Sequence, residues 1–162
     1  MTAKTEQSGG CQCGAVRYRA NGELGYPHVC HCRMCQKAAG NYFLPLAGVM
    51  RVDFELTRGE PKWFHSSGLV RRGFCGDCGT PLFYDIPDAD SINITLGSLD
   101  DPQAVKPVMQ SNLDSKMVWF HALDGLPVEL EPETTDREDG IAASNHQHPD
   151  HDTSQWPSGA HP

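Results

Sequence analysis

The distribution of cysteine constrains this chain more than any other feature of its sequence. Seven cysteines fall into three tight clusters: Cys11-Gln12-Cys13, Cys30-His31-Cys32-Arg33-Met34-Cys35 and Cys75-Gly76-Asp77-Cys78. An odd number of cysteines argues against a closed disulfide framework, and the polar stretch from Met1 to Gly10 has no apolar signal-peptide core. We therefore expect a cytoplasmic protein in a reducing compartment, with thiolates available to bind metal.

The third cluster has the spacing of a zinc knuckle. In a C-x-x-C-G sequence the turn directs backbone N–H groups at both sulfurs, and the trailing glycine, Gly79, accepts a conformation that is costly for other residues. A closed tetrahedral zinc site needs four ligands, and both other clusters can donate the second pair. We pair Cys11 and Cys13 with Cys75 and Cys78, because glycines flank the C-x-C step and residues two apart in a strand share a face.

This pairing leaves Cys30, Cys32 and Cys35, which we call the trio. Three protein ligands with an open fourth position are typical of a catalytic zinc, where water or substrate completes the tetrahedron. Two alternatives stay open for the trio. It can be a second structural zinc site closed by His31, His28 or His65, or a reactive thiol pair without metal. We expect His31 to pack rather than bind, because it would strain to join its own neighbours on one ion.

The two sites differ in how firmly they should hold zinc. A closed site with four thiolates keeps its metal, whereas a site with three thiolates can lose it. We therefore expect full zinc occupancy at the four-cysteine site and partial or exchangeable zinc at the trio.

The body of the chain is divided into short segments that are typical of strands. Gly and Asp-Pro turn signals separate them, and at most one or two short helical turns are expected, with residues 33–39 the favoured place. The pattern predicts a mainly β domain over residues 1–132. The expected strands are Ala15 to Arg19, Tyr42 to Leu46, Val49 to Leu56, Lys62 to His65, Leu82 to Asp85, Ile92 to Leu96 and Met117 to Leu123.

Residues 133–162 have the composition of an acidic, His-rich, disordered tail. From Glu129 onward there are eight acidic residues and one basic residue, so most of the net charge of −8 lies there and the body is nearly neutral. A nearly neutral body predicts neither nucleic-acid binding nor attachment to an anionic membrane. No apolar run approaches the roughly 18 residues that a membrane helix needs.

The clusters, in this order, resemble the glutathione-dependent formaldehyde-activating enzyme family, which includes the centromere protein V branch. The resemblance covers roughly residues 8 to 130. The segments that carry it are Gly9 to Tyr18, the trio with Gln36-Lys37 and Gly40, Ser66-Ser67, Arg72 to Leu82, Ser115 to Trp119 and Asp124 to Pro127.

This resemblance implies a β-tent fold, built from small antiparallel sheets around a structural zinc. It also implies a carbon–sulfur lyase that forms or cleaves S-hydroxymethylglutathione, with Cys11, Cys13, Cys75 and Cys78 as structural ligands and the trio as the catalytic site. Family members often carry a histidine just before the Ser-Lys step, whereas residues 109–114 of this chain contain none. The substrate can therefore be a glutathione-type thiol adduct of formaldehyde or of another small electrophile.

Three further residues are candidates for substrate binding. Lys37, together with Arg33, can offset the negative charge of three thiolates and attract an anionic thiol such as glutathione. Arg72 can contact a substrate carboxylate with two hydrogen bonds, and Ser67 can donate one nearby. Two other functions stay open: a zinc-scaffolded binding module without turnover, and a thiol sensor in which oxidation releases zinc.

Overall fold

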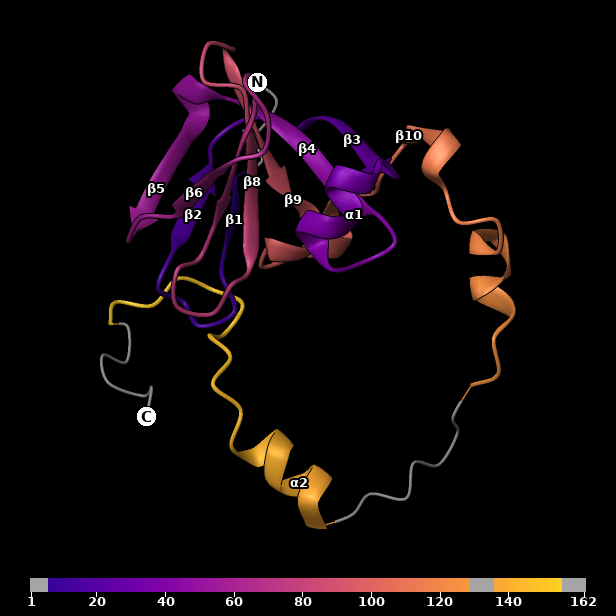
Figure 1. Ribbon diagram of the computed structural model, residues 1–162. Coiled ribbons are helices and arrows are strands. Elements are labelled where there is room, and N and C mark those ends of the chain that lie inside the picture. The colour runs from indigo at the N-terminus through magenta and orange to yellow at the C-terminus, as the bar shows by residue number, and fades with distance from the viewer. Residues whose placement is uncertain (1–5, 129–135, 156–162) are drawn as a thin grey trace.

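The computed structural model describes residues 6–128 and 136–155 of the chain. Two β-sheets dominate it, and the helices are few and short (Figure 1). This architecture confirms the mainly β fold class that the sequence predicts. Within the described residues, no helix is long and apolar enough to cross a membrane.

The smaller sheet has three antiparallel strands in the order β1-β2-β5. The larger sheet has seven strands in the order β10-β3-β4-β9-β8-β7-β6 and is antiparallel except for the pair β10 and β3. The strands are β1 (Gln7–Gly10), β2 (Arg17–Ala20), β3 (Gly25–Cys30), β4 (Leu44–Met50), β5 (Phe54–Arg58), β6 (Lys62–His65), β7 (Arg71–Phe74), β8 (Pro81–Asp85), β9 (Ser91–Thr95) and β10 (Met109–Ser111).

Two α-helices and several short 3₁₀ turns complete the described part of the chain, and the second helix and the last two turns follow the last strand. Helix α1 (Arg33–Ala39) follows β3, and Cys32 caps its first turn by accepting a hydrogen bond from the backbone N–H of Cys35. Helix α2 (Asp136–Ala143) stands away from the sheets (Figure 1). The 3₁₀ turns are η1 (Arg51–Asp53), η2 (Leu96–Ser98), η3 (Pro102–Ala104), η4 (Leu113–Ser115) and η5 (Phe120–Gly125).

The main core lies between the two sheets. Tyr18 of β2 is fully buried, and its ring lies 5.4 Å from Phe83 of β8 and 6.0 Å from Phe54 of β5. The Tyr18 hydroxyl is paired with Ser98 at 2.7 Å, so its burial leaves no unsatisfied polar group. Removal of these aromatic surfaces from water holds the two sheets together.

The strand and helix predictions succeed in part. Helix α1 and strand β6 have the predicted bounds. The single strand expected over Val49 to Leu56 is wrong, because the turn η1 interrupts it where the chain passes from the larger sheet to the smaller one. The strand expected at Met117 to Leu123 is also wrong. Hydrogen bonds from backbone N–H groups to the carbonyls three residues earlier wind this segment into a 3₁₀ turn. Phe120 packs perpendicular to His31, with 4.9 Å between the ring centroids.

Part of the acidic C-terminal segment returns to the sheets. Within residues 147–153, His148 contacts the loop that follows β1, at Gln12 between Cys11 and Cys13. The His148 N–H donates to the Gln12 carbonyl at 2.7 Å, and the His148 side chain is buried. A Cβ at Gly14 would come within 2.2 Å of the His148 ring, so this contact requires a glycine there.

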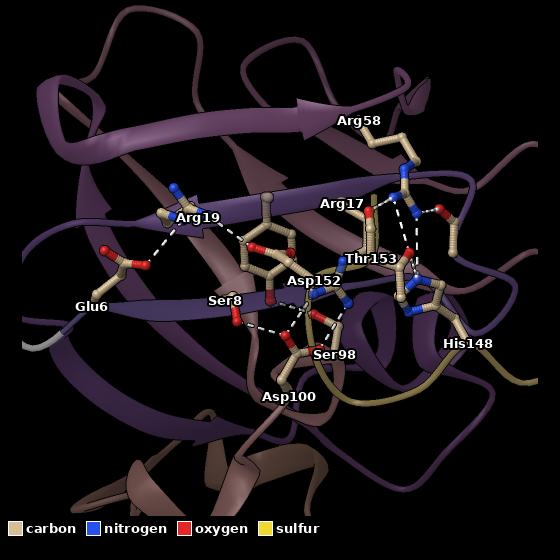
Figure 2. A network of polar contacts seen from close by, with 12 residues as sticks. Glu6, Ser8, Arg17, Arg19, Arg58, Ser98, Asp100, His148, Asp152 and Thr153 are labelled. Atoms are coloured by element: carbon tan, nitrogen blue, oxygen red, sulfur yellow. Dashed lines mark hydrogen bonds and ion pairs between the residues drawn. The ribbon is translucent and has the colours of Figure 1, made fainter. Parts of the chain in front are cut away.

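Ion pairs hold the same segment in place. Asp152 accepts a hydrogen bond from buried Arg17 at 2.8 Å, and the Arg17 guanidinium also pairs with Asp100 (Figure 2). Arg58 donates to the Thr153 carbonyl and to its hydroxyl. The sequence did not predict these contacts. The proposed boundary at residue 132 lies outside the described residues.

Candidate metal centres

The four cysteines paired by sequence reasoning meet between the two sheets. Cys11 and Cys13 lie on the loop after β1 of the smaller sheet, whereas Cys75 and Cys78 lie on the turn between β7 and β8 of the larger sheet. Their sulfurs all lie within 4.8 Å of one another. We call this group the four-cysteine cluster, and it is placed to join the two sheets through a single ion.

The sulfur spacing of this cluster fits a tetrahedral metal. The Sγ–Sγ distances are 3.6 Å for Cys11 and Cys13 and 3.8 Å for Cys13 and Cys75. A tetrahedral zinc with Zn–S bonds of about 2.3 Å places its sulfurs about 3.8 Å apart. The distances are too long for disulfides, whose S–S bond is about 2.05 Å. The donor set and its geometry therefore fit a closed thiolate site.

Backbone N–H groups point at the sulfurs, as the knuckle sequence predicts. Val16 N–H donates to Cys11 Sγ at 3.2 Å, and Asp77 N–H donates to Cys75 Sγ at 3.4 Å. Gly79 has a φ of 78°, in the left-handed region that glycine adopts at little cost. These hydrogen bonds stabilise sulfur in its thiolate form, which is the form that binds metal.

The thiols of the cluster have divergent acidities in the chain without metal. Burial raises the pKa of the Cys11 thiol to about 11. Burial acts in the same direction on Cys78, but hydrogen bonds from Thr80 outweigh it and lower the pKa of that thiol to about 6. Four neighbouring thiolates repel one another, so they ionise together only when a cation compensates their charge.

The trio forms a second cluster where β3 meets α1. Cys30 is the last residue of β3, Cys32 caps α1, and Cys35 lies in its first turn. The three sulfurs lie within 4.8 Å of one another. Cys30 and Cys35 are buried, whereas Cys32 is partly exposed. This arrangement offers three ligands on one side and solvent access on the other, which suits an open metal site.

No histidine joins the trio among the residues that the structure describes. The His31 side chain is fully buried, with its Nε2 3.0 Å from Gln110 Oε1 and its ring perpendicular to that of Phe120. Closure of the trio by a fourth protein ligand is therefore not seen in the described part of the chain.

Two side chains from other strands touch the sulfurs of the trio. Arg72 of β7 is buried and donates from Nη2 to Cys35 Sγ at 3.5 Å, while its guanidinium lies over the Tyr84 ring at 5.1 Å. Asn112 follows β10 and donates from Nδ2 to Cys30 Sγ at 3.3 Å. A cation and an amide thus surround sulfurs that carry negative charge when metal is bound.

The pKa shifts of two thiols in the trio have opposite directions. Burial raises the pKa of the Cys35 thiol to about 12, although the Arg72 guanidinium acts against the increase. Burial also acts to raise the pKa of the Cys30 thiol, but hydrogen bonds from the Cys32 backbone and the Ser111 hydroxyl outweigh it and lower that pKa. The Cys30 thiol is therefore more acidic than a free thiol, whereas the Cys35 thiol is less acidic.

The candidate substrate residues lie in different settings. Lys37 and Arg72 line one cavity of about 460 Å³ beside the trio, and neighbouring Ser66 lines it too. The Ser67 hydroxyl accepts hydrogen bonds from the N–H groups of Leu69 and Val70 within a tight turn. Participation of Ser67 in substrate binding stays a prediction.

Sequence reasoning missed Asn112 and Gln36. Gln36 is buried and donates from Nε2 to the carbonyls of His31 and Ser115, which ties α1 to the segment after β10. Asn112 reaches Cys30 only because β10 pairs in parallel with β3. Because β10 and β3 are distant in sequence, no local motif marks Asn112 as a neighbour of Cys30.

Comparisons with known proteins agree with this geometry. The sequence profile of the glutathione-dependent formaldehyde-activating enzyme family matches residues 6–115, a range that contains all seven cysteines. An uncharacterized lyase of Schizosaccharomyces pombe is 28% identical over 79 residues, which cover 49% of this chain and 57% of that protein. A crystal structure of a Rhodobacter sphaeroides protein is similar in fold, with a TM-score of 0.52 at 19% identity, over 64% of this chain and 99% of that one.

Proposed function

Because this chain belongs to the glutathione-dependent formaldehyde-activating enzyme family, we propose that it is a zinc-dependent carbon–sulfur lyase. Its substrate is a glutathione-type adduct of formaldehyde or of another small electrophile. The observation that carries this proposal is the trio, whose three sulfurs converge and have no further protein ligand in the described residues, while Arg72, which contacts Cys35, lines a cavity. As part of the same proposal, the four-cysteine cluster holds a structural zinc and the protein works in a reducing cytoplasm, an environment in which thiols stay available to bind metal.

The reaction is the reversible cleavage of a hemithioacetal. The hydroxyl of the adduct loses its proton, the O–H electron pair becomes the second bond of the aldehyde carbonyl, and the carbon–sulfur bond breaks. The bonding electrons stay on sulfur, which takes up a proton and leaves as a free thiol. Zinc bound at the trio would supply Lewis acidity toward oxygen and stabilise sulfur as a thiolate.

The surrounding residues set the charge of this site. Three thiolates on one divalent ion leave a formal charge of −1, which disfavours the approach of an anionic thiol. The Arg72 guanidinium beside Cys35 offsets this charge within the buried half of the site. Lys37 and Arg33 project from α1 at the exposed side and attract anionic substrates. Cations on the buried side and on the exposed side of the trio thus compensate its negative charge.

The proposal is tested by the Cys32→Ser variant. The wild type should accelerate loss of S-hydroxymethylglutathione above the spontaneous rate, whereas the variant should fall to that rate because one of only three ligands is lost. Val52→Ser, at a side chain that is 90% exposed and outside the site, serves as the matched control. Equal rates for wild type and Cys32→Ser would refute the lyase assignment.

A further inference from the structure

A large hollow lies between α1 and the strands β6 and β7, and it is connected to the trio through Arg72, which contacts Cys35. The cavity of about 460 Å³ is lined by Arg33, Met34, Lys37, Ala38, Phe64, Ser66 and Arg72. A second hollow of about 310 Å³ shares Ala38, Phe64 and Arg72 with the first and extends toward Leu44 and Phe83. Together they form one recess, whose size lies in the range of small-molecule sites.

Arg72 links this recess to the trio. Its side chain lines both hollows, and its Nη2 lies 3.5 Å from Cys35 Sγ. Met34 lines the recess directly before Cys35 in α1. A substrate whose carbon–sulfur bond lies at the trio therefore has room to extend its remaining atoms along Arg72 into the recess.

The walls of the recess are largely apolar. Met34 is 57% exposed and Phe64 is 62% exposed, although contact of such apolar side chains with water is unfavourable. Besides buried Arg72, two exposed cations of α1 lie at the rim: the Lys37 side chain has no hydrogen bond or ion pair within the described residues, and Arg33 donates to Gln36. Apolar walls with cations at the rim match a ligand that has an apolar part and an anionic part.

Formaldehyde does not fill such a recess. If the recess receives the electrophile side of the adduct, one added carbon would leave Met34, Phe64 and Ala38 uncovered, whereas a longer apolar substituent would bury them and gain affinity with each methylene group. We infer that the recess binds an apolar substituent of several carbons on the electrophile, so that the preferred substrate is a thiol adduct of a hydrophobic aldehyde. This inference rests on the proposed lyase function and specifies its substrate class.

Binding of two stable thioethers tests the inference without turnover. Calorimetric titration of the full chain, at a measured zinc content, compares S-methylglutathione with S-hexylglutathione. If the added methylenes enter the recess, the hexyl compound should bind at least about tenfold more tightly. Phe64→Ala and Met34→Ala should each reduce this ratio at least about threefold and leave the affinity for S-methylglutathione within about twofold. Met50→Ala, at a 48% exposed methionine outside the recess, should leave the ratio unchanged.

The outcomes separate this inference from the lyase proposal. Equal affinity for the two thioethers, no binding of either, or an unchanged ratio in Phe64→Ala would overturn the assignment of the recess. None of these results depends on whether wild type cleaves S-hydroxymethylglutathione. Conversely, absence of cleavage together with a ratio that depends on Phe64 would refute the lyase function and retain an apolar thioether site.

Discussion

The buried guanidinium of Arg72 donates a hydrogen bond to the sulfur of Cys35 at 3.5 Å. This contact joins β7, whose end leads into the four-cysteine cluster, to α1, which carries the trio. Since the Arg72 side chain also lines the recess, one residue contacts both the candidate ligand set and the candidate substrate space. Its charge compensates a thiolate that burial alone would disfavour.

Replacement of Arg72 by methionine should weaken metal binding at the trio by about 10- to 100-fold, because loss of a partner of a metal ligand typically has this effect. Zinc per chain after dialysis against a graded chelator measures the change, and the variant should retain one zinc where wild type retains two. Arg33→Met removes the same charge from an exposed position that contacts no sulfur, so it should behave as wild type. Equal retention by the two variants would contradict a role for the Arg72 contact.

The two cysteine clusters should differ in their effect on stability. Cys11→Ser removes a ligand from the cluster that joins both sheets, and we expect the melting temperature to fall by more than about 10 °C. Cys32→Ser affects a partly exposed position at one end of a single helix, so the melting temperature should change by less than about 3 °C. Thermal unfolding followed by circular dichroism measures both. A larger loss in Cys32→Ser would reverse the assignment of the two sites.

Asn112 combines a left-handed backbone with a hydrogen bond to Cys30, and two variants separate these roles. The residue has a φ of 56°, which alanine tolerates less well than glycine by about 1 kcal/mol. Asn112→Ala should therefore be less stable in urea unfolding than Asn112→Gly by about that amount. Both lose the N–H···S bond and should lose the same amount of metal affinity at the trio. Unequal metal affinities of the two variants would show that backbone strain at residue 112, and not loss of the amide, determines metal binding at the trio.

Acid should release the C-terminal segment at residues 147–153. Hydrogen bonds from Arg17 and Arg19 hold the pKa of the Asp152 carboxyl below its usual range. For Asp100, burial acts in the opposite direction, but the bonds from Arg17 and Ser8 outweigh it and lower the pKa of that carboxyl as well. Both contributions to stability are present above the usual aspartate pKa near 4 and are lost as the pH falls through the lowered values.

A truncation after residue 144 measures this contribution. The shortened chain should be less stable than the full chain at pH 7, and the difference should shrink as the pH falls below about 4. Asp152→Ala should reproduce part of the loss, below about 1 kcal/mol because the side chain is 40% exposed. Asp150→Ala removes an acid of the same segment whose side chain has no hydrogen-bond or ion-pair partner among the described residues, and it should have no effect. A difference that does not depend on pH would show that the ion pairs do not hold the segment.

The sequence predicted the local features of this fold better than the distant ones. The pairing of Cys11 and Cys13 with Cys75 and Cys78 followed from turn geometry and glycine placement, and these sulfurs converge in the structure. Helix α1 was located correctly because its start and end are signalled within a few residues.

Other features depend on contacts between distant segments. Strand β10 has only three residues, and its parallel pairing with β3 places Asn112 against Cys30 across 82 positions of sequence. The segment from Met117 to Leu123 is rich in apolar residues like a strand, but aromatic packing of Phe120 on His31 favours a coiled turn. Charge composition indicated solvent exposure for the C-terminal segment and gave no sign of the basic side chains that meet Asp152.

Cleavage measured against zinc content tests the central claim most directly. Chains that hold between one and two zinc ions, prepared by partial chelation, are assayed for loss of S-hydroxymethylglutathione. If the four-cysteine cluster keeps the first ion and the trio carries the chemistry, the rate should be at the spontaneous level at one zinc per chain and rise linearly to a maximum at two. A full rate at one zinc per chain, or no change between one and two, would contradict the account.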